Sequence, residues 1–310
     1  MEWFTKIDIA GKPILKADSR VLLIGSCFSD EISARMKASG MPVTANPFGT
    51  QYNPLSIAAC LERLLSGEPF TADELIAHNG LYHSSLHHGA FSYPTPDETL
   101  SRINEALMSG HEALLDAEVI IVTLGSAWVY EEGGQVVSNC HKRPATLFAK
   151  RRLGVTEIVT RLREVLGEPV YQNKQILFTV SPIRHKADGL HENALSKGTL
   201  LLAVDELMRD EARYRYFPAY EIMMDELRDY RFYDKDLCHP SEQAVDYIWE
   251  RVQESLFAPQ ETAVLKEIAA AKRALAHRPL HGETEQYKAF HSQAMATWKA
   301  LQEKYPWLEK

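Results

Sequence analysis

The chain has 310 residues, of which 45% are hydrophobic and 25% charged, and its formal net charge is −8. This length allows one large domain with a substantial core, and the acidic balance argues against a nucleic-acid-binding surface. No run of 18 apolar residues occurs, and the N-terminus lacks the apolar stretch of a signal peptide, so we expect no membrane span and a cytoplasmic protein. The four cysteines form no Cys-x-x-Cys pair and are expected as thiols. Two short basic runs, 141–143 and 150–152, are expected on solvated loops or helices.

Three short apolar runs rich in β-branched residues predict strands that are buried on both faces of a parallel sheet. They cover residues 21–24, 119–124 and 176–180, and each is followed by a small residue. A further run at 216–220 is expected at an edge or an end of the sheet, because Pro218 cannot donate a ladder hydrogen bond.

Helical periodicity lies between these runs. Apolar residues recur at three- and four-residue spacing in residues 29–39, 54–66, 97–116, 156–166, 196–213 and 240–257. The alternation of strand and helix predicts an α/β fold, with a doubly wound parallel sheet between two helical layers. Residues 261–276 and 283–305 predict two further helices. We therefore expect one domain over 1–257 and a helical extension over 258–310, which packs on that domain and could form a homo-oligomer contact.

The first candidate site is Gly25-Ser26-Cys27-Phe28, directly after the first strand. Ligands of such sheets bind beyond the carboxyl ends of the strands, where residues 25–27, 125–126 and 181–182 are expected to gather. Gly25 permits a tight turn, so Ser26 or Cys27 would lie at the start of a helix. The backbone N–H groups there favour negative charge and lower the pKa of a thiol. The alternative is a small buried thiol beside a tight turn.

The second candidate site is the segment Asp236-Leu237-Cys238-His239-Pro240. His239 and Pro240 suit the N-cap and N1 positions of the following helix. Asp236 can hold the Nδ1–H group of His239 and leave Nε2 facing a nucleophile. The alternative is a histidine that caps a helix and an aspartate that bonds loop amides.

These two segments resemble the GSCFA family, which is named after the segment that begins at Gly25 and is placed within the SGNH (GDSL-like) hydrolase superfamily. Further segments carry the likeness, which spans about residues 20–255: 46–50, 125–128, 139–142, 181–185 and 236–240. The resemblance implies a three-layer α/β/α sandwich with a parallel, flavodoxin-like sheet. By extension from the superfamily, it also implies hydrolysis of ester-linked acyl groups.

Carried over residue by residue, the resemblance places Cys27 where the superfamily has its nucleophilic serine, with Ser26 as the rival nucleophile. His239 would be the base and Asp236 the acid that orients it. A thiolate can form an acyl-enzyme, so cysteine at this position is compatible with catalysis.

The resemblance also implies an oxyanion hole, for which Gly49 is the candidate glycine. The asparagine of the superfamily's third block is absent from Gly125-Ser126-Ala127-Trp128. Ser126 could supply a hydrogen bond in its place, or Asn139 could reach in from the next loop.

Candidate substrate-binding side chains follow the third strand, and they are Arg184, His185, Asn193 and Lys197. Arg184 and Lys197 could bind an anionic or hydroxyl-rich substrate, or Arg184 could pair with Asp188 or Glu192 and stabilise its loop. Residues 78–94 predict a loop rich in histidine and aromatic residues. This loop could be a lid in which His83 and His87 contact a sugar, or a plain surface loop.

We expect an esterase that acts on a small-molecule or carbohydrate ester, with no metal, no cofactor and no nucleic-acid or membrane partner. Two alternatives stay open. One is a non-catalytic carbohydrate- or ligand-binding module with the same fold. The other is a metal site built from Cys27, Cys140, His141, Cys238 and His239.

Overall fold

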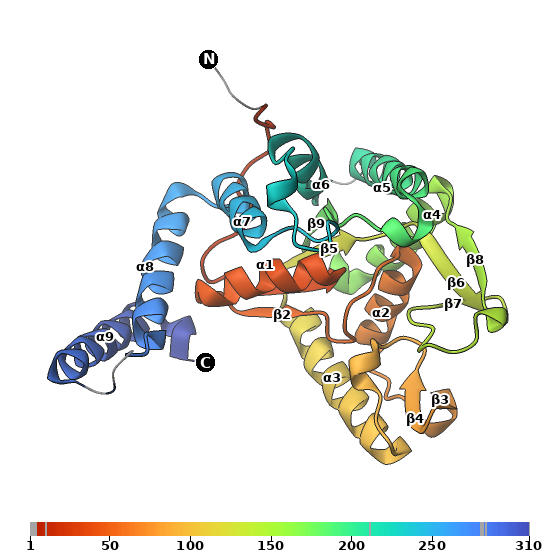
Figure 1. The fold of residues 1–310 in the computed structure, drawn as a ribbon, viewed down its shortest axis with the longest axis horizontal. Coiled ribbons are helices and arrows are strands. Elements are labelled where there is room, and N and C mark those ends of the chain that lie inside the picture. The colour runs from red at the N-terminus through yellow and green to blue at the C-terminus, as the bar shows by residue number, and fades with distance from the viewer. Residues whose placement is uncertain (1–4, 10, 211, 280–281, 283, 310) are drawn as a thin grey trace.

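A five-stranded parallel sheet in the order β10–β9–β5–β1–β2 forms the centre of the protein (Figure 1). The computed structural model describes residues 5–9, 11–210, 212–279, 282 and 284–309. The strands are β1 (Val21–Gly25), β2 (Val43–Ala45), β5 (Val119–Leu124), β9 (Gln175–Val180) and β10 (Tyr214–Phe217). This is the strand order of flavodoxin-like sheets, so the predicted doubly wound α/β fold is confirmed.

The central strands are apolar throughout because both of their faces are covered. Every residue of β1 and of β5 is buried. Along β1 the side chains alternate, so that Leu22 and Ile24 enter one core while Val21 and Leu23 enter the other. The strand predicted at 216–220 is confirmed as an edge strand, β10, and Pro218 follows its last residue.

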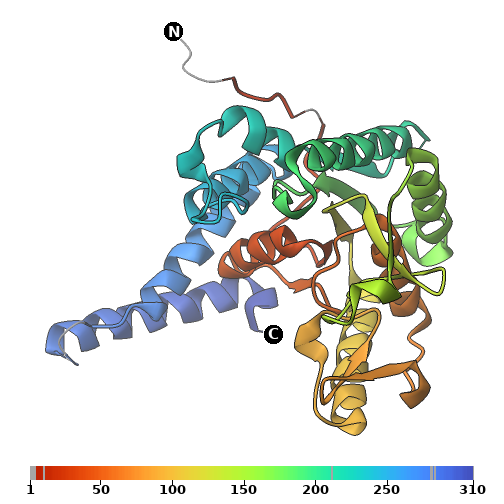
Figure 2. The same cartoon turned by 45° about the vertical axis from the view of Figure 1, so that its right-hand side comes forward.

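Helices cover both faces of the sheet and complete a three-layer sandwich (Figures 1 and 2). One core packs against α2 (Pro54–Ser66), α3 (Pro96–Asp116), α4 (Val155–Leu166) and α5 (Leu190–Asp210). The other packs against α1 (Cys27–Ala38) and α7 (Glu242–Leu256).

Two small antiparallel sheets lie outside these layers, and the periodicity analysis predicted neither of them. One is the hairpin of β3 (Leu75–His78) and β4 (Leu81–Ser84), which occupies part of the segment expected to be a loop. The other joins β6 (Trp128–Glu132), β7 (Gln135–Val137) and β8 (Ala149–Arg152).

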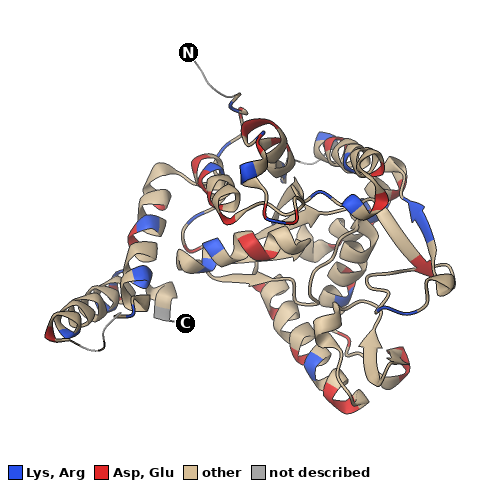
Figure 3. Ribbon diagram, in the orientation of Figure 1, with Lys and Arg blue, Asp and Glu red and all other residues tan. Residues whose placement is uncertain are grey.

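The basic run at 150–152 lies on β8, and not on a loop or a helix as expected (Figure 3). Carboxylates accompany each of its cations: Lys150 pairs with Asp188, Arg151 with Glu131 and Glu157, and Arg152 with Glu192. The run is therefore not an unneutralised basic patch.

The starts of α5 and α7 differ from the predicted ones near the candidate site. Helix α5 begins at Leu190, six residues before the predicted start at 196. Helix α7 begins at Glu242, because the hydroxyl of Ser241 caps it by accepting a hydrogen bond from the Ala244 N–H at 3.3 Å. The proposed capping role of His239 and Pro240 is therefore wrong, and Pro240 instead forms a bridge with Tyr233.

The C-terminal residues form two helices, α8 (Pro259–Ala276) and α9 (Glu285–Lys304), which project from the body as an arm (Figures 1 and 2). Helix α8 joins the body through Leu265, which is fully buried in the core shared by α1 and α7. Its Glu261 carboxylate accepts a hydrogen bond from the Ala17 N–H at 2.8 Å. Upstream of Ala17, the amides of Ile14 and Leu15 both donate to the Leu256 carbonyl.

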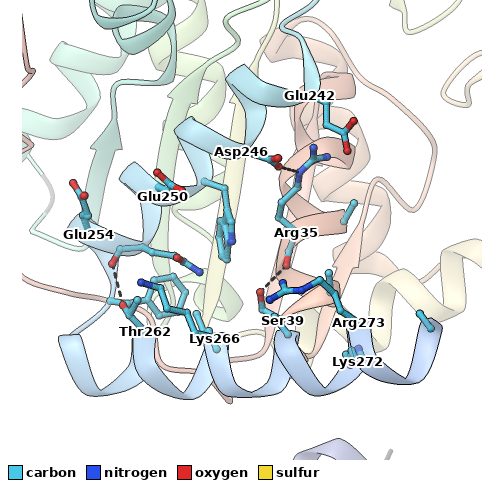
Figure 4. A pocket seen from close by; sticks show the side chains of 18 of the residues that line it. Arg35, Ser39, Glu242, Asp246, Glu250, Glu254, Thr262, Lys266, Lys272 and Arg273 are labelled. Atoms are coloured by element: carbon cyan, nitrogen blue, oxygen red, sulfur yellow. Dashed lines mark hydrogen bonds and ion pairs between the residues drawn. The ribbon is translucent and has the colours of Figure 1, made fainter. Parts of the chain in front are cut away.

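An open groove of about 1780 Å³ lies where α1, α7 and α8 meet (Figure 4). Glu242, Asp246, Glu250 and Glu254 lie along its α7 side, while Lys266, Lys272 and Arg273 lie along α8. Arg35, on the C-terminal half of α1, forms an ion pair with Asp246 at 3.1 Å. Among the described helices, none combines the length and the apolar character that a membrane span requires.

Candidate active site

The predicted site residues follow the carboxyl ends of β1, β5 and β9. Strand β1 leads into Gly25-Ser26-Cys27, β5 into Gly125-Ser126, and β9 into Ser181. Strand β1 lies between β2 and β5. The chain therefore adds β2 on one side of β1, and it adds β5, β9 and β10 on the other side. Open α/β sheets bind ligands at such a switch point.

Gly25 is required by the close approach of β1 to β5. Its φ is +145°, and a Cβ atom at this position would lie 2.2 Å from the Thr123 carbonyl oxygen. Its N–H donates to Asn46 Oδ1 at 2.9 Å, and Asn46 Nδ2 donates to Asp30 Oδ1 at 2.8 Å. The sequence analysis gave Asn46 and Asp30 no role, although Asn46 opens one of the segments that resemble the family.

Ser26 and Cys27 have opposite accessibility. Ser26 is 0% exposed, and its Oγ atom is buried without a hydrogen-bond partner. Cys27 is partly exposed and is the first residue of α1, where the backbone N–H groups of Cys27 and Phe28 act to lower the pKa of its thiol. Burial, followed by the Asp30 carboxylate, outweighs the effect of these amides and raises the pKa of Cys27. Cys27 therefore rests as a thiol and needs a base to become a nucleophile.

Asp236 and His239 form the pair that their spacing predicts. Asp236 Oδ2 lies 2.5 Å from His239 Nδ1, while Oδ1 accepts the N–H groups of Cys238 at 2.8 Å and His239 at 3.0 Å. The His239 amide, then its ring, then the Cys238 amide hold the pKa of Asp236 well below its usual range. The pair is about half exposed, and the carboxylate is fixed by a loop with Leu237 at φ +57°.

The loop of Asp236 and His239 is tied to the end of β9. The N–H of Arg184 donates to the Cys238 carbonyl at 3.1 Å, and Lys186 donates to the Asp236 carbonyl. Within the described residues, His239 forms no hydrogen bond with Ser26 or Cys27. A proton transfer from Cys27 to His239 would therefore require a bridging water or a movement of the exposed histidine.

Lys197, on α5, lies beneath the edge of the sheet and not on its surface. It is 1% exposed, and Nζ donates to the carbonyls of Gly125 at 2.6 Å and Ser181 at 2.7 Å. Burial lowers the pKa of Lys197 to about 7, while the neighbouring Cys27 acts in the opposite direction. Direct binding of an exposed substrate group by Lys197, as the sequence suggested, does not fit this position.

His185 and Asn193 form a second buried unit at the same edge. The His185 N–H donates to Asn193 Oδ1 at 3.0 Å, and the His185 ring meets Tyr52 edge-on at 6.0 Å. Burial and then the Lys197 charge lower the pKa of His185 to about 4, and His239 adds to the effect. The ring Nε2 of His185 and Nδ2 of Asn193 are buried without partners.

Arg184 lies on the far side of this unit, against a short π-helix at Ile222–Glu226. Its Nη1 contacts the Met224 sulfur at 3.7 Å, and its Nε is buried without a partner. In the described part of the chain Arg184 forms no ion pair, so the alternative of pairing with Asp188 or Glu192 is wrong: these two carboxylates pair with Lys150 and Arg152.

Local turns occupy the backbone N–H groups of Gly49 and Ser126, whereas the side chains of Ser126 and Asn139 act there as acceptors. The Gly49 N–H donates to the Asn46 carbonyl at 2.7 Å, and the Ser126 N–H donates to the Tyr52 carbonyl at 2.7 Å. Ser126 Oγ accepts the Trp128 N–H at 3.1 Å, and Asn139 Oδ1 accepts the His141 N–H at 2.8 Å. The N–H groups of Cys27 and Phe28 lie at the N-terminus of α1, where amides have no partner within the helix.

His83 and His87 belong to the β3–β4 region and are held there by internal contacts. His83 Nδ1 lies 2.7 Å from Ser92 Oγ, and its ring stacks on His141 at 4.5 Å. His87 is 1% exposed among Phe48, Phe70 and Phe91, and burial lowers its pKa to about 3. A substrate contact from His87 does not fit this burial.

The metal-site alternative has no geometric basis in the described residues. They contain no group of three or more His, Cys, Asp and Glu side chains arranged to hold a metal ion. His141 instead donates from Nε2 to the Ser84 carbonyl at 2.8 Å.

Comparison with known families accounts for most of the chain. The GSCFA family matches residues 20–252, and the GSCFA domain protein, C-terminal domain, matches residues 268–309. No curated protein matches the chain. The first match covers the sheet and both candidate segments, and on this ground the chain belongs to the GSCFA family.

Proposed function

We propose that the protein hydrolyses ester bonds through a covalent intermediate on Cys27, in the manner of the SGNH hydrolases. The observation that carries the proposal is the Asp236–His239 pair. One carboxylate oxygen holds Nδ1 of the imidazole at 2.5 Å, and the other is fixed by two backbone amides. This arrangement orients a histidine and leaves its Nε2 for proton transfer.

Cys27 is a better candidate nucleophile than Ser26 because Cys27 is accessible and Ser26 is fully buried. In the first step the Cys27 sulfur attacks the ester carbonyl carbon, and the thiol proton passes to His239 Nε2. The C–O bond to the alcohol then breaks, and His239 returns the proton to the leaving alcohol. Water cleaves the resulting thioester, releases the acid and regenerates the thiol.

The amides of Cys27 and Phe28 supply the oxyanion donors in this proposal. They lie at the N-terminus of α1, where N–H groups have no partner within the helix. The oxyanion that develops on the ester carbonyl oxygen, as the sulfur adds to the carbon, would accept hydrogen bonds from them. The substrate class we propose is a small-molecule or carbohydrate ester, and the carbohydrate part comes from analogy with the superfamily.

A series of four variants tests the proposal with a short-chain p-nitrophenyl ester. Cys27→Ala and His239→Ala should each lower the hydrolysis rate by 10²-fold or more, on the order seen when a nucleophile or base is removed. Ser26→Ala should keep activity, and Cys140→Ala, which changes another partly exposed thiol, is the control. Full activity in Cys27→Ala together with inactive Ser26→Ala would move the nucleophile to Ser26.

A non-catalytic ligand-binding module is the second candidate. The observation in its favour is that the N–H groups of Gly49 and Ser126 are both satisfied within the protein. If the wild type and all four variants hydrolyse the ester no faster than the uncatalysed reaction, the binding module becomes the better proposal.

A further inference from the structure

Arg184 is a half-buried cation that has no carboxylate partner in the described part of the chain. Its Nη1 contacts the Met224 sulfur at 3.7 Å, and its Nε is buried without an acceptor. A thioether sulfur is a weak acceptor, so this contact does little to replace the water that the guanidinium has lost. Two other arginines with little exposure, Arg143 and Arg251, each pair with a glutamate. The guanidinium of Arg184 thus lacks the anion that its burial favours.

The Tyr233 hydroxyl meets the same sulfur. It donates to Met224 at 3.7 Å, so that the sulfur brings a phenol and the guanidinium together. Met224 belongs to the π-helix Ile222–Glu226, and single π turns are frequent at functional sites. An anionic group in this place would be a far better acceptor for both donors than the thioether is.

Backbone hydrogen bonds fix both donors next to the loop of the proposed base. The Arg184 N–H donates to the Cys238 carbonyl at 3.1 Å. The Asp234 N–H, which follows Tyr233 in the chain, donates to the His239 carbonyl at 2.8 Å. A group that is bound by these two donors therefore lies beside His239.

This position is on the leaving-group side of the proposed reaction. Arg184 follows β9, which is two strands away from β1, or about 10 Å at the usual strand spacing. In the proposed mechanism Cys27, after β1, holds the acyl group, whereas His239 returns a proton to the alcohol. A charged group held beside His239 is therefore part of the alcohol.

We propose that Arg184 and Tyr233 bind an anionic group, a carboxylate or a phosphate, on the alcohol part of the substrate. The inference deepens the proposed function and rests on His239 as its base. The anion would accept charge-assisted hydrogen bonds from the guanidinium, in place of the contact with sulfur, and one from the Tyr233 hydroxyl. No bond to either side chain forms or breaks, so both are specificity-determining residues.

The first test measures binding of p-hydroxybenzoate, an alcohol that carries a carboxylate, and of its neutral methyl ester by isothermal titration calorimetry. The wild type should bind p-hydroxybenzoate at least tenfold more tightly, as expected when a hydrogen bond joins two charged groups. Arg184→Gln should abolish this preference, and Tyr233→Phe should reduce it about threefold or more. Arg228→Gln is the matched control, since Arg228 follows the same π-helix but pairs with Asp225, and it should keep the preference.

A guanidinium with a purely structural role would give a different result. If the wild type binds the two probes equally, or binds neither of them, the proposal is overturned, and this comparison depends on no variant. A preference that persists in Arg184→Gln, with the variant folded by circular dichroism, would also overturn it.

Ester hydrolysis separates this inference from the proposed function. The kcat/KM ratio of p-acetoxybenzoate to its methyl ester reports recognition of the carboxylate, and Arg184→Gln should lower this ratio about tenfold. If probe binding depends on Arg184 but hydrolysis depends on neither Cys27 nor His239, the anion site stands and the esterase fails. If hydrolysis depends on Cys27 and His239, while Arg184→Gln changes neither the ratio nor probe binding, the esterase stands and the anion site fails.

Discussion

Replacing Gly25 with alanine tests how tightly the turn before the nucleophile is built. Gly25 has φ +145°, a conformation that residues with a side chain rarely adopt. Its new Cβ would lie 2.2 Å from the Thr123 carbonyl oxygen, which is more than 1 Å short of an ordinary van der Waals contact. Gly25 and Thr123 are register partners on β1 and β5, so relief of the clash has to separate the two central strands.

The cost of this separation has three parts. Backbone strain at a disfavoured φ costs about 1–3 kcal/mol, and overpacking costs about 1–3 kcal/mol more. The Ser26 N–H also donates to the Thr123 carbonyl at 3.2 Å, and loss of this hydrogen bond adds about 1 kcal/mol. Together, Gly25→Ala should lower the free energy of unfolding by about 3–7 kcal/mol, a large share of the roughly 5–15 kcal/mol of a typical protein.

Urea unfolding followed by circular dichroism measures this loss, and the midpoint should fall by about 1 M or more. Gly11→Ala is the control, since Gly11 also has positive φ, at +127°, but no atom lies within 4 Å of its added Cβ. It should cost about 1–3 kcal/mol, because only backbone strain applies. Equal losses in the two variants would show that the approach of β1 to β5 is not the constraint.

Three further changes probe the acid–base pair, a buried histidine and a buried ion pair. Asp236→Asn should lower kcat by about 10²-fold or more with little effect on the melting temperature, because the amide no longer fixes the His239 tautomer; an unchanged kcat would remove His239 as the base. His87 has a pKa of about 3 when folded against about 6.5 unfolded, so its contribution to stability is complete above pH 6.5 and is lost as the pH falls toward 3. About 2 kcal/mol of that loss falls between pH 7 and pH 5, and His87→Phe should abolish it in urea titrations at the two pH values. Arg251→Met should destabilise the protein by about 3–5 kcal/mol, because it leaves the fully buried Glu226 carboxylate without its cation; a loss below about 1 kcal/mol would contradict this.

The strands of the central sheet are predictable because burial on both faces leaves an uninterrupted apolar run. The short strand β2 and the hairpins β3–β4 and β6–β7 lack such runs and were not predicted. The sequence does carry a hairpin signal for β6–β7. Gly133-Gly134 suits a two-residue turn, and the runs on either side of it have the alternating or β-branched residues of strands. The start of α7 was misjudged because proline suits N1, whereas the serine directly after Pro240 makes the actual cap.

The position of the candidate site followed from topology, since the carboxyl ends of parallel strands share one edge. The Asp236–His239 contact was also predictable, because it joins residues three apart in one loop. The burial of Lys197 was not, because its carbonyl partners lie 72 and 16 residues away and no local pattern marks them. The same holds for Asn46, whose amide bridges Gly25 and Asp30 from a different loop.

The contacts of the N-terminal segment have a consequence for the order in which the chain can fold. Ile14 and Leu15 bond to the end of α7, and Ala17 bonds to Glu261 of α8, 244 residues later. During synthesis residues 14–17 therefore have to wait until the end of α7 and the start of α8 have been made. Closure of so long a loop is slow. Until this loop closes, α7 and α8 do not cover the apolar face of α1. A nascent chain can bind chaperones or aggregate through that face.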